Sequence, residues 1–348
     1  MTGTITTRAY ARIGFMGNPS DGYFGKTIAC AITNFWAEVT LWESPTLQIK
    51  PHPVHDPLAF VSFSSLAETV TQHGYYGGVR LILAACKRFY EYCRHHHIPL
   101  GEKNWTIAYE TTIPRQVGLG GSSAIITAVI KALMQFYALT DADIPKPRQA
   151  DLIWRVELEE LGIAGGLQDR VVQVYGGTVF MDFSRELMEQ YGHGRYEYLD
   201  SRLLPPLFLA YAPYSTPSGI VHGDVRRRYE QNDPEVVQAM QTLGEYAQAC
   251  RMALAQRDFR RIGELMKQNF ALRRRIYGDA VLGEQNLQMI AIACRLGCPA
   301  KFAGSSGSVI GLYHTEETFQ CLAQAYQARG FSCVKVTVDP GPPHSPTG

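Results

Sequence analysis

The sequence predicts an α+β fold, and three features support this class. Alternating and β-branched apolar segments, which are typical of strands, are concentrated in the first half of the chain. Segments with apolar residues at helical spacing fill most of the second half. A glycine-rich turn at 114–124 joins a strand to a helix. The chain has 348 residues, of which 46% are hydrophobic, so it is long enough to form two domains.

The first part of the chain is expected to mix strands with helices. Residues 104–112 alternate as a strand that runs into the glycine-rich turn. The helix after the turn should end near Leu139, before Pro145. Further strands are expected at 9–16, 27–42 and 178–183, and further helices at 78–94, 148–161 and 166–175.

The second part is expected to be mostly helical. Two prolines within residues 203–206 interrupt the chain, and we place a domain boundary between residues 204 and 205. The predicted domains are therefore 1–204 and 205–339, followed by a disordered tail at 340–348. Helices are expected at 217–230, 234–255, 258–275, 282–296 and 315–329, with strands at 207–212, near 308–313 and near 332–338.

Composition excludes several classes of function. The net charge is +1, so neither nucleic acid nor an anionic membrane surface is an expected partner. No segment approaches the roughly 18–20 apolar residues that span a bilayer, and the first residues lack the apolar core of a secretory signal. The eight cysteines contain no C-x-x-C pair, which predicts buried or partly buried free thiols in a reducing cytoplasm.

The glycine-rich turn is the most informative feature of the chain. It reads Pro-Arg-Gln-Val-Gly-Leu-Gly-Gly-Ser-Ser-Ala from Pro114 to Ala124 and opens an apolar helix. Unpaired N–H groups and the helix dipole make such a turn an anion site, most often for phosphate. It is not a Walker A loop or a dinucleotide turn, because Ser20 and Ser123 stand where those motifs need glycine. The alternative is an ordinary strand–helix turn.

Three further groups of residues could carry chemistry. The turn after the first strand presents Arg12, Asn18 and Asp21, although a polar turn alone would also explain them. Glu157 ends an acidic helix, and Asp169 lies in the first turn of the next helix, where a carboxylate also favours the helix dipole. Residues 301–308 form a second loop of small residues, which is either a simple hairpin or the wall of a ligand site.

Taken together, these motifs resemble those of the galactokinase, homoserine kinase, mevalonate kinase and phosphomevalonate kinase (GHMP) superfamily. The order of segments 11–25, 114–124 and 301–308 matches the three motifs of that superfamily. Within it, segments 74–80 and 164–177 are most similar to plant-type glucuronokinases, and the likeness runs from about residue 8 to 338. The resemblance implies a two-domain GHMP kinase fold, with a ribosomal-S5-like N-terminal α/β domain and a helix-rich, ferredoxin-like C-terminal domain.

Two departures from the superfamily pattern stand out. The third loop reads Gly-Ser-Ser-Gly-Ser from Gly304, where the superfamily has a more glycine-rich run. The phosphate loop has Gly120 and Gly121, where members usually have a serine at one of these positions. The first departure could alter phosphate contacts or loop mobility, whereas the second removes a hydroxyl but keeps the backbone donors.

The resemblance also implies roles for individual residues. Asp169 would be the general base, and Arg12 would stabilise the transferring phosphoryl group. Mg²⁺ would be held by Ser123 and Glu157, with Glu159 and Glu160 as competitors. The implied ATP contacts are Pro114, Gly118, Leu119, Gly120, Gly121, Ser122, Ser123, Ala124, Gly304 and Ser305. The implied substrate contacts are Asn18, Asp21, Arg115 and Gly177.

The implied reaction is ATP-dependent phosphorylation of the anomeric hydroxyl of D-glucuronate. The sugar carboxylate needs a cationic partner, for which Arg115, Arg80 and the triplet at 273–275 are candidates. The alternatives are a GHMP kinase for another sugar (galactose, galacturonate, an N-acetylhexosamine or a heptose) and a sensor that binds ATP and sugar without catalysis. The expected partner is a small molecule, and the expected protein is a cytoplasmic monomer or homodimer.

Overall fold

The computed structural model describes residues 3–73, 77–213 and 219–342, and these segments form an α+β fold. The chain divides into two compact units, each of which is assembled from separate stretches of sequence. Unit 1 consists of Met1–Ala9, Trp36–Thr112 and Ser122–Ile163. Unit 2 consists of Tyr10–Phe35, Ile113–Gly121 and Ala164–Gly348. The predicted domain boundary at 204/205 stays a prediction, and residues 343–348 of the predicted tail lie outside the described residues.

Unit 1 contains a small sheet and several helices. The second half of β2 (Lys26–Glu43) pairs antiparallel with β4 (Trp105–Thr111), and β3 (Gln48–Ile49) runs parallel to β4. Helix α3 (Gly121–Phe136) is apolar on almost every side, so most of its residues are buried. The other helical elements are α1 (Phe63–His73), α2 (Gly78–His95), α4 (Lys146–Arg155) and the π-helical turn η2 (Val156–Glu160).

Unit 2 holds two sheets. In the first, the opening half of β2 pairs with β5 (Thr178–Asp182), which pairs in turn with β6 (Arg195–Leu199), and every pairing is antiparallel. Strand β1 (Ile5–Met16) also pairs with β2 and leads into the short 3₁₀ helix η1 (Ser20–Tyr23). The other elements of this part of the unit are α5 (Gln168–Tyr175), α6 (Arg185–Tyr191) and η3 (Ser201–Leu203).

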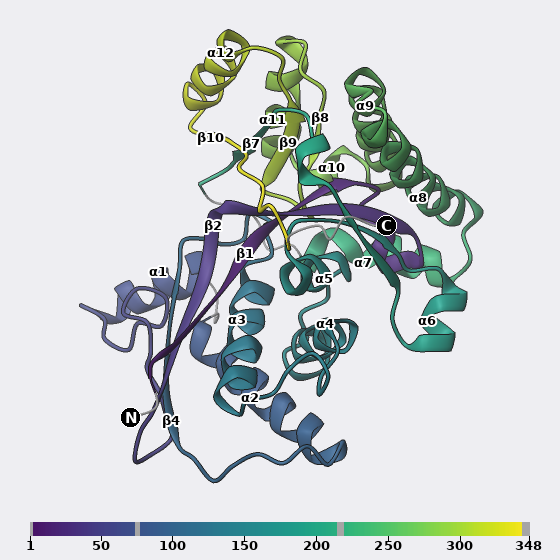
Figure 1. Ribbon diagram of the computed structural model, residues 1–348. Coiled ribbons are helices and arrows are strands. Elements are labelled where there is room, and N and C mark those ends of the chain that lie inside the picture. Colours follow the sequence, from purple (N-terminus) through teal and green to yellow (C-terminus); the bar gives the residue numbers. More distant parts are fainter. Residues whose placement is uncertain (1–2, 74–76, 214–218, 343–348) are drawn as a thin grey trace. The chain divides into compact units, whose positions relative to one another are not determined.

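The second sheet of unit 2 has four antiparallel strands in the order β10-β7-β9-β8. Its strands are β7 (Leu207–Tyr211), β8 (Ala300–Phe302), β9 (Ser308–Leu312) and β10 (Ser332–Lys335). Six helices belong to the same part of the chain, and α9 contacts β8 while α12 contacts β10 (Figure 1). They are α7 (Gly219–Glu230), α8 (Pro234–Ala255), α9 (Phe259–Tyr277), α10 (Asp279–Leu282), α11 (Glu284–Arg295) and α12 (Glu316–Gln327).

Local sequence explains where these helices begin. Asp233, Asp258 and Thr315 each accept hydrogen bonds from backbone N–H groups in the first turns of α8, α9 and α12. Such caps satisfy donors that have no partner within the helix. The helix predicted at 282–296 is α11, which begins at Glu284 because Gly283, with a φ of +80°, separates it from the short α10.

Most helices and strands lie where the sequence pattern predicts them, but several short ones do not show in that pattern. The strands expected at 9–16, 27–42, 104–112, 178–183 and 207–212 are confirmed. Helices α1 and α6 and strands β3 and β6 were not predicted, because they are short or rich in polar side chains. The eight cysteines are free thiols, but Cys294 and Cys321 are exposed, so the expectation that all would be buried or partly buried was wrong for these two.

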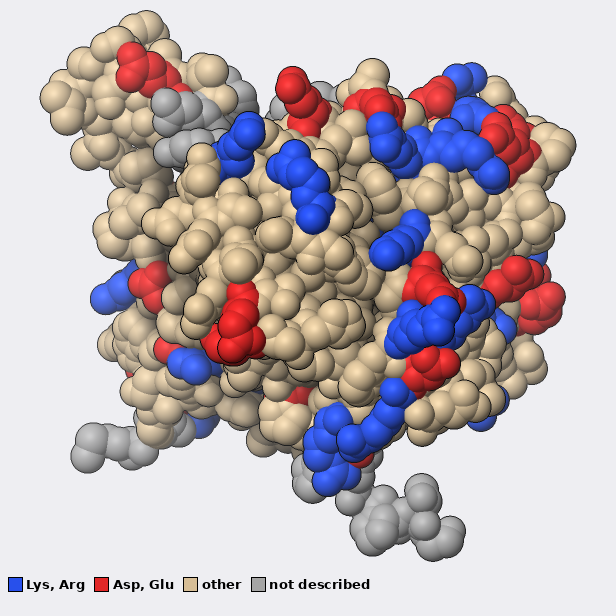
Figure 2. All heavy atoms as spheres, turned by 90° about the horizontal axis from the view of Figure 1, so that it is seen from above, with Lys and Arg blue, Asp and Glu red and all other residues tan. Residues whose placement is uncertain are grey.

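Both signs of charge are interspersed on the molecular surface. Figure 2 shows acidic and basic side chains close to one another on one face, with wide uncharged areas between them. Many are paired, as in Arg202 with Asp200 and Lys335 with Glu316. Exposed pairs of this kind add little to stability. Within the part of the chain that the structure describes, no helix has both the length and the apolar character needed to cross a membrane.

A buried hydrogen bond in the core of unit 2 can be tested by mutation. The Tyr326 hydroxyl is buried and donates a 2.8 Å hydrogen bond to the Met289 carbonyl. We expect Tyr326→Phe to lower the free energy of unfolding by about 1–2 kcal/mol, because this bond is lost without a change of shape. Denaturant unfolding measures the change. Tyr90→Phe is the control, since Tyr90 is 57% exposed. Equal stability of the two variants would contradict the assigned contact.

Candidate active site

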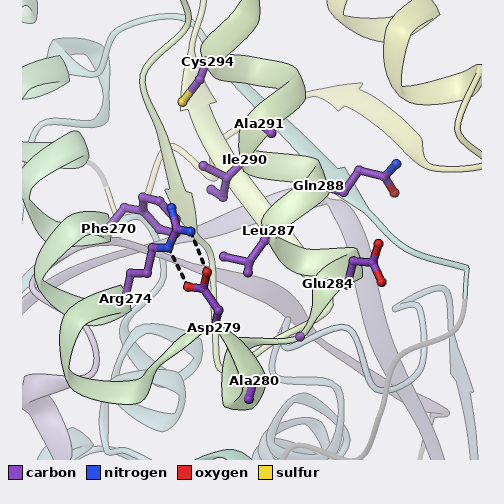
Figure 3. A pocket seen from close by; sticks show the side chains of 11 residues that line it. Phe270, Arg274, Asp279, Ala280, Glu284, Leu287, Gln288, Ile290, Ala291 and Cys294 are labelled. Carbon is purple, nitrogen blue, oxygen red and sulfur yellow. Dashed lines mark hydrogen bonds and ion pairs between the residues drawn. The ribbon is translucent and has the colours of Figure 1, made fainter.

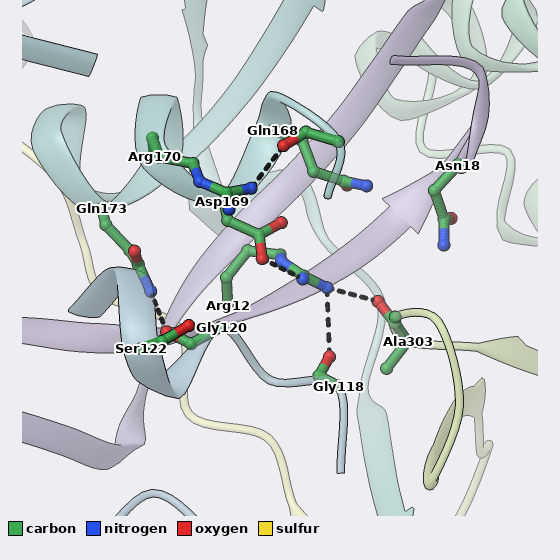
Figure 4. A network of polar contacts seen from close by, with 12 residues as sticks. Arg12, Asn18, Gly118, Gly120, Ser122, Gln168, Asp169, Arg170, Gln173 and Ala303 are labelled. Carbon is green, nitrogen blue, oxygen red and sulfur yellow. Dashed lines mark hydrogen bonds and ion pairs between the residues drawn. The ribbon is translucent and has the colours of Figure 1, made fainter. Parts of the chain in front are cut away.

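Arg12 lies at the centre of a polar network within unit 2 (Figure 4). Its side chain extends from β1, whose neighbouring residues are apolar, and it is 5% exposed. One terminal nitrogen, Nη2, donates to Oδ2 of Asp169 at 2.5 Å. The other, Nη1, donates to the carbonyl oxygens of Ala303 at 2.8 Å and Gly118 at 3.3 Å. One guanidinium therefore joins the predicted base, the glycine-rich turn and the third loop.

Asp169 is held in its charged form. It lies in the first turn of α5, as the sequence predicted. Burial alone would raise the pKa of Asp169, but the positive charges of Arg12 and Arg170, together with the hydrogen bond from Arg12, outweigh it and lower the pKa below its usual value. The carboxylate is therefore deprotonated at neutral pH and is only a weak base in the resting protein.

The glycine-rich turn takes the conformation that its sequence predicts. Gly118 and Gly120 have φ values of +70° and +71°, which favour glycine. The carbonyl of Leu119 accepts the backbone N–H of Arg12, and that of Gly120 accepts the side-chain amide of Gln173. With these carbonyls engaged, the turn leads directly into the first residues of α3.

The third loop, residues 303–307, packs against this turn with almost no clearance. A Cβ on Gly304 would overlap the carbonyl oxygen of Gly118. A Cβ on Gly118 would lie 2.6 Å from the carbonyl oxygen of Ser306. The Ser308 hydroxyl also donates to the Val117 carbonyl at 2.7 Å. Glycine is thus required at 118 and 304 by the close approach of two backbones.

Asn18 and Asp21, which were predicted to contact substrate, are both buried in unit 2. The two oxygens of Asp21 accept hydrogen bonds from the backbone and side-chain amides of Gln168, each at 3.1 Å. Burial raises the pKa of Asp21. Oδ1 of Asn18 accepts a 2.5 Å bond from Lys301. Both side chains are therefore held in fixed orientations.

Lys301 itself was overlooked as a polar site residue. Its ammonium donates to the carbonyls of Gly14 and Phe302 as well as to Asn18, so all three protons are used. Burial, with the nearby positive charges of Arg273 and Arg12, holds the pKa of Lys301 well below its usual value. Its local sequence is an ordinary strand, and only the fold reveals its partners.

The predicted metal ligands lie in unit 1. The carboxylate of Glu157 is buried in η2 and accepts a 2.5 Å hydrogen bond from the Ser122 hydroxyl. Ser123, the predicted ligand, is the next residue in the first turn of α3 and is also buried. Glu159 and Glu160 form ion pairs with Arg88, and Glu160 also pairs with Lys87. These pairs leave Glu157 as the acidic residue associated with the serines. Oxygen donors of this kind suit Mg²⁺.

The arginine candidates differ sharply in their surroundings. Arg274 forms a two-point ion pair with Asp279 beside a pocket of about 770 Å³ between α9, α10 and α11 (Figure 3). Arg275 lies 3.6 Å from Glu235. Arg273, by contrast, is 2% exposed and has no acidic partner among the described residues. Arg80 and Arg115 are half-buried.

Gly177 has a different environment from the other predicted substrate residues. Its N–H donates to Asp339 at 3.0 Å, and its carbonyl accepts the N–H of Ala31. Its φ of +65° and its close approach to Gly341 explain why glycine is present here. None of its described hydrogen bonds involves Arg12 or Asp169. Tyr75 and Tyr76, which belong to the 74–80 segment, lie outside the described residues.

His52, His55 and Glu110 form a group in unit 1 that the sequence analysis did not single out. Nδ1 of His52 accepts the backbone N–H groups of Val54 and His55, each at 3.1 Å. The proton of a neutral ring therefore lies on Nε2, which is 3.0 Å from both carboxylate oxygens of Glu110. A metal would need a lone pair on that nitrogen. The arrangement fits a hydrogen-bonded turn and not a metal centre.

The close packing of the third loop predicts the effect of one methyl group. We expect Gly304→Ala to lower stability by about 1–3 kcal/mol, because the added Cβ must displace the Gly118 carbonyl. Gly101→Ala is the matched control, since a Cβ there meets nothing within 4 Å. Thermal unfolding of both variants measures the difference. Two variants of equal stability would show that the loop does not pack as described.

The chain has sequence relatives among known proteins. Residues 80–177 match the family described as GHMP kinases N terminal domain. The chain is 47% identical over 309 residues to Glucuronokinase 1 of Arabidopsis thaliana, which covers 89% of this chain and 85% of the relative. It is 48% identical to Probable glucuronokinase 2 of the same plant, which covers 88% of this chain and 84% of the relative.

A solved structure shares the fold at low sequence identity. The Lin0012 protein from Listeria innocua superposes with a TM-score of 0.76 at 16% identity, covering 97% of this chain and 98% of that protein. This likeness supports the α+β architecture, whereas the extended identity to the plant proteins establishes kinship. The chain belongs to the GHMP kinase superfamily and, within it, to the glucuronokinase family.

Proposed function

We propose that the protein transfers the terminal phosphoryl group of ATP to the anomeric hydroxyl of D-glucuronate, giving D-glucuronate 1-phosphate and ADP. The observation that carries the proposal is the 47% identity to Glucuronokinase 1 over 89% of the chain. The ion pair of Arg12 and Asp169 supports it, because phosphoryl transfer to a hydroxyl needs a group that can take the proton. Membership of the family makes ATP the phosphate donor.

In this proposal, ATP phosphates bind along the glycine-rich turn and the start of α3. Gly118 and Gly120 allow close approach of the backbone, and the first N–H groups of the helix point toward the anion. Pro114, Leu119, Gly121, Ser122, Ser123 and Ala124 complete the proposed donor site. The favourable helix dipole adds to these hydrogen bonds.

Ser123 and Glu157 are the proposed holders of Mg²⁺, with Ser122 beside them. The buried carboxylate and the two hydroxyls in the first turn of α3 are hard oxygen donors, so they fit this ion. When bound, Mg²⁺ neutralises charge on the phosphates. Ser122 keeps the carboxylate oriented through its 2.5 Å hydrogen bond.

Asp169 is the proposed acceptor of the sugar proton. Since its pKa is lowered, it cannot remove a proton from a resting hydroxyl. It can accept the proton late, when the new oxygen–phosphorus bond has made the hydroxyl acidic, as a loose transition state allows. Arg12 keeps the carboxylate charged and aimed. In addition, Arg12 is the proposed source of positive charge near the transferring group.

The sugar is proposed to lie near Asn18 and Asp21, whose positions are fixed by Lys301 and Gln168. Its carboxylate needs a cation, and the surroundings of the arginines narrow the choice. Arg274 and Arg275 already face acidic side chains. Arg115, Arg80 and Arg273 therefore remain the proposed candidates.

A panel of acceptors tests this function. ADP release would be measured with ATP and Mg²⁺ against glucuronate, galacturonate, glucose, galactose and N-acetylhexosamines. We expect glucuronate to give a kcat/KM at least about tenfold above every neutral sugar, because only a sugar acid offers a carboxylate to an arginine of the site. Turnover of a neutral sugar alone would support kinase activity but contradict glucuronate as the acceptor. No turnover with any sugar would favour the sensor alternative.

A further inference from the structure

The third loop is held by hydrogen bonds from the side chain of Arg273 on α9. Its sequence has two serines where related loops are richer in glycine. Arg273, on α9, reaches the loop and donates to two successive carbonyl oxygens, those of Gly304 at 2.8 Å and Ser305 at 2.6 Å. A planar guanidinium can hold two acceptors in a fixed geometry, which a single ammonium cannot.

These two bonds also set the direction of the loop's amide groups. In a trans peptide, the carbonyl of one residue and the N–H of the next point in opposite directions. Because the carbonyls of Gly304 and Ser305 point toward Arg273, the N–H groups of Ser305 and Ser306 point away from it. Their nitrogens lie 3.3 and 3.4 Å from the position of a Cβ on Gly118, which places them on the side of the glycine-rich turn.

The donors on that side are not used by the described parts of the chain. Neither N–H of Ser305 nor that of Ser306 meets an acceptor within residues 3–73, 77–213 and 219–342. The hydroxyl of Ser306 is also without a partner there, although the residue is only 3% exposed. Buried donors are normally satisfied, so the buried Ser306 hydroxyl, together with the N–H groups of Ser306 and the partly buried Ser305, indicates a ligand that accepts hydrogen bonds. Successive N–H groups of this kind form an anion site.

The Arg273 guanidinium is surrounded by aromatic rings and makes no ion pair with a carboxylate among the described residues. Its guanidinium lies 4.9 Å from the ring centre of Phe302 and 5.4 Å from that of Tyr277. Burial lowers the pKa of Arg273, with the nearby carboxyl group of Asp21 acting in the opposite direction. The positive charge is therefore directed at the two loop carbonyls, which strengthens the N–H donors at the other ends of the same peptides.

The loop also lies next to the proposed base. Ala303, the first residue of the loop, accepts from the same Arg12 guanidinium that binds Asp169. The phosphoryl group that is transferred must lie near that carboxylate. Because the loop shares Arg12 with Asp169, we assign the N–H groups of Ser305 and Ser306 to the terminal phosphate and not to the other phosphates of the nucleotide.

We propose that Arg273 is a positioning residue that holds Ser305 and Ser306 as a hydrogen-bonding site for the terminal phosphoryl group of ATP. The inference rests on the proposed function for the identity of the anion. It adds a named cause for the loop's shape, namely two hydrogen bonds from α9. It also assigns Arg273 to the phosphate side and not to the sugar carboxylate.

The test uses nucleotide binding without any sugar. Calorimetry would compare ADP with a non-hydrolysable ATP analogue that has an imido group between the last two phosphates, both with Mg²⁺. For Arg273→Lys we expect the analogue to bind roughly tenfold more weakly, while ADP affinity changes less than about twofold, because the lysine keeps the charge but cannot hold both carbonyls. Arg274→Lys is the matched control on the same helix, since its partner is Asp279.

A second variant covers the case in which Arg273→Lys does not fold. Ser306→Ala removes only the hydroxyl that has no partner among the described residues. We expect this change to lower the affinity for the analogue about threefold and to leave the affinity for ADP unchanged. Unchanged affinity for the analogue in both variants would overturn the proposal, as would an equal loss for ADP and the analogue. Because no acceptor is present, an error about glucuronate leaves these results unaffected. In steady state, Arg273→Lys should raise KM for ATP and leave KM for the sugar within about twofold.

Discussion

The burial of one guanidinium constrains most of the site in unit 2. Arg12 is 5% exposed and binds Asp169, Gly118 and Ala303 at once. A buried charge is costly unless its donors are satisfied, so the glycine-rich turn and the third loop must both bring a carbonyl to it. Glycine at 118 and 304 then follows, because the two backbones meet at the distances this requires. The position of the base and the shape of both loops thus have a common origin.

The same unit buries several basic side chains. Arg12, Arg273 and Lys301 are all buried, and two of them, whose pKa values burial lowers, are held by backbone or amide oxygens and not by carboxylates. Asp169 offsets Arg12, while burial raises the pKa of Asp21 and so disfavours its charged form. Such an arrangement suits anionic ligands, and a nucleotide triphosphate with a sugar acid would supply them. Phosphoryl transfer benefits from fixed positive groups that need no rearrangement during the reaction.

The sequence was sufficient for the order of elements and the glycine-rich turn but not for the partners of buried charges. Strand periodicity and the turn residues between 104 and 124 are local signals, so that part was predicted well. Arg12 and Asp169 are 157 residues apart, and their pairing follows only from the fold. Arg273 and Lys301 lie in an amphipathic helix and a short strand whose patterns show packing and not function. Likewise, the Ser122 bond to Glu157 depends on how η2 meets α3.

The most direct test of this account is a kinetic cycle on Arg12 and Asp169 with ATP and glucuronate. The variants are Arg12→Lys, Asp169→Asn and both together, and kcat is measured for each. If Arg12 acts largely by holding the base, each single change should lower kcat by about 10²–10⁴-fold, and the double variant should be at most about threefold slower than the slower single one. Losses that multiply would contradict the claim that Arg12 acts mainly through Asp169, because the two residues would then act independently.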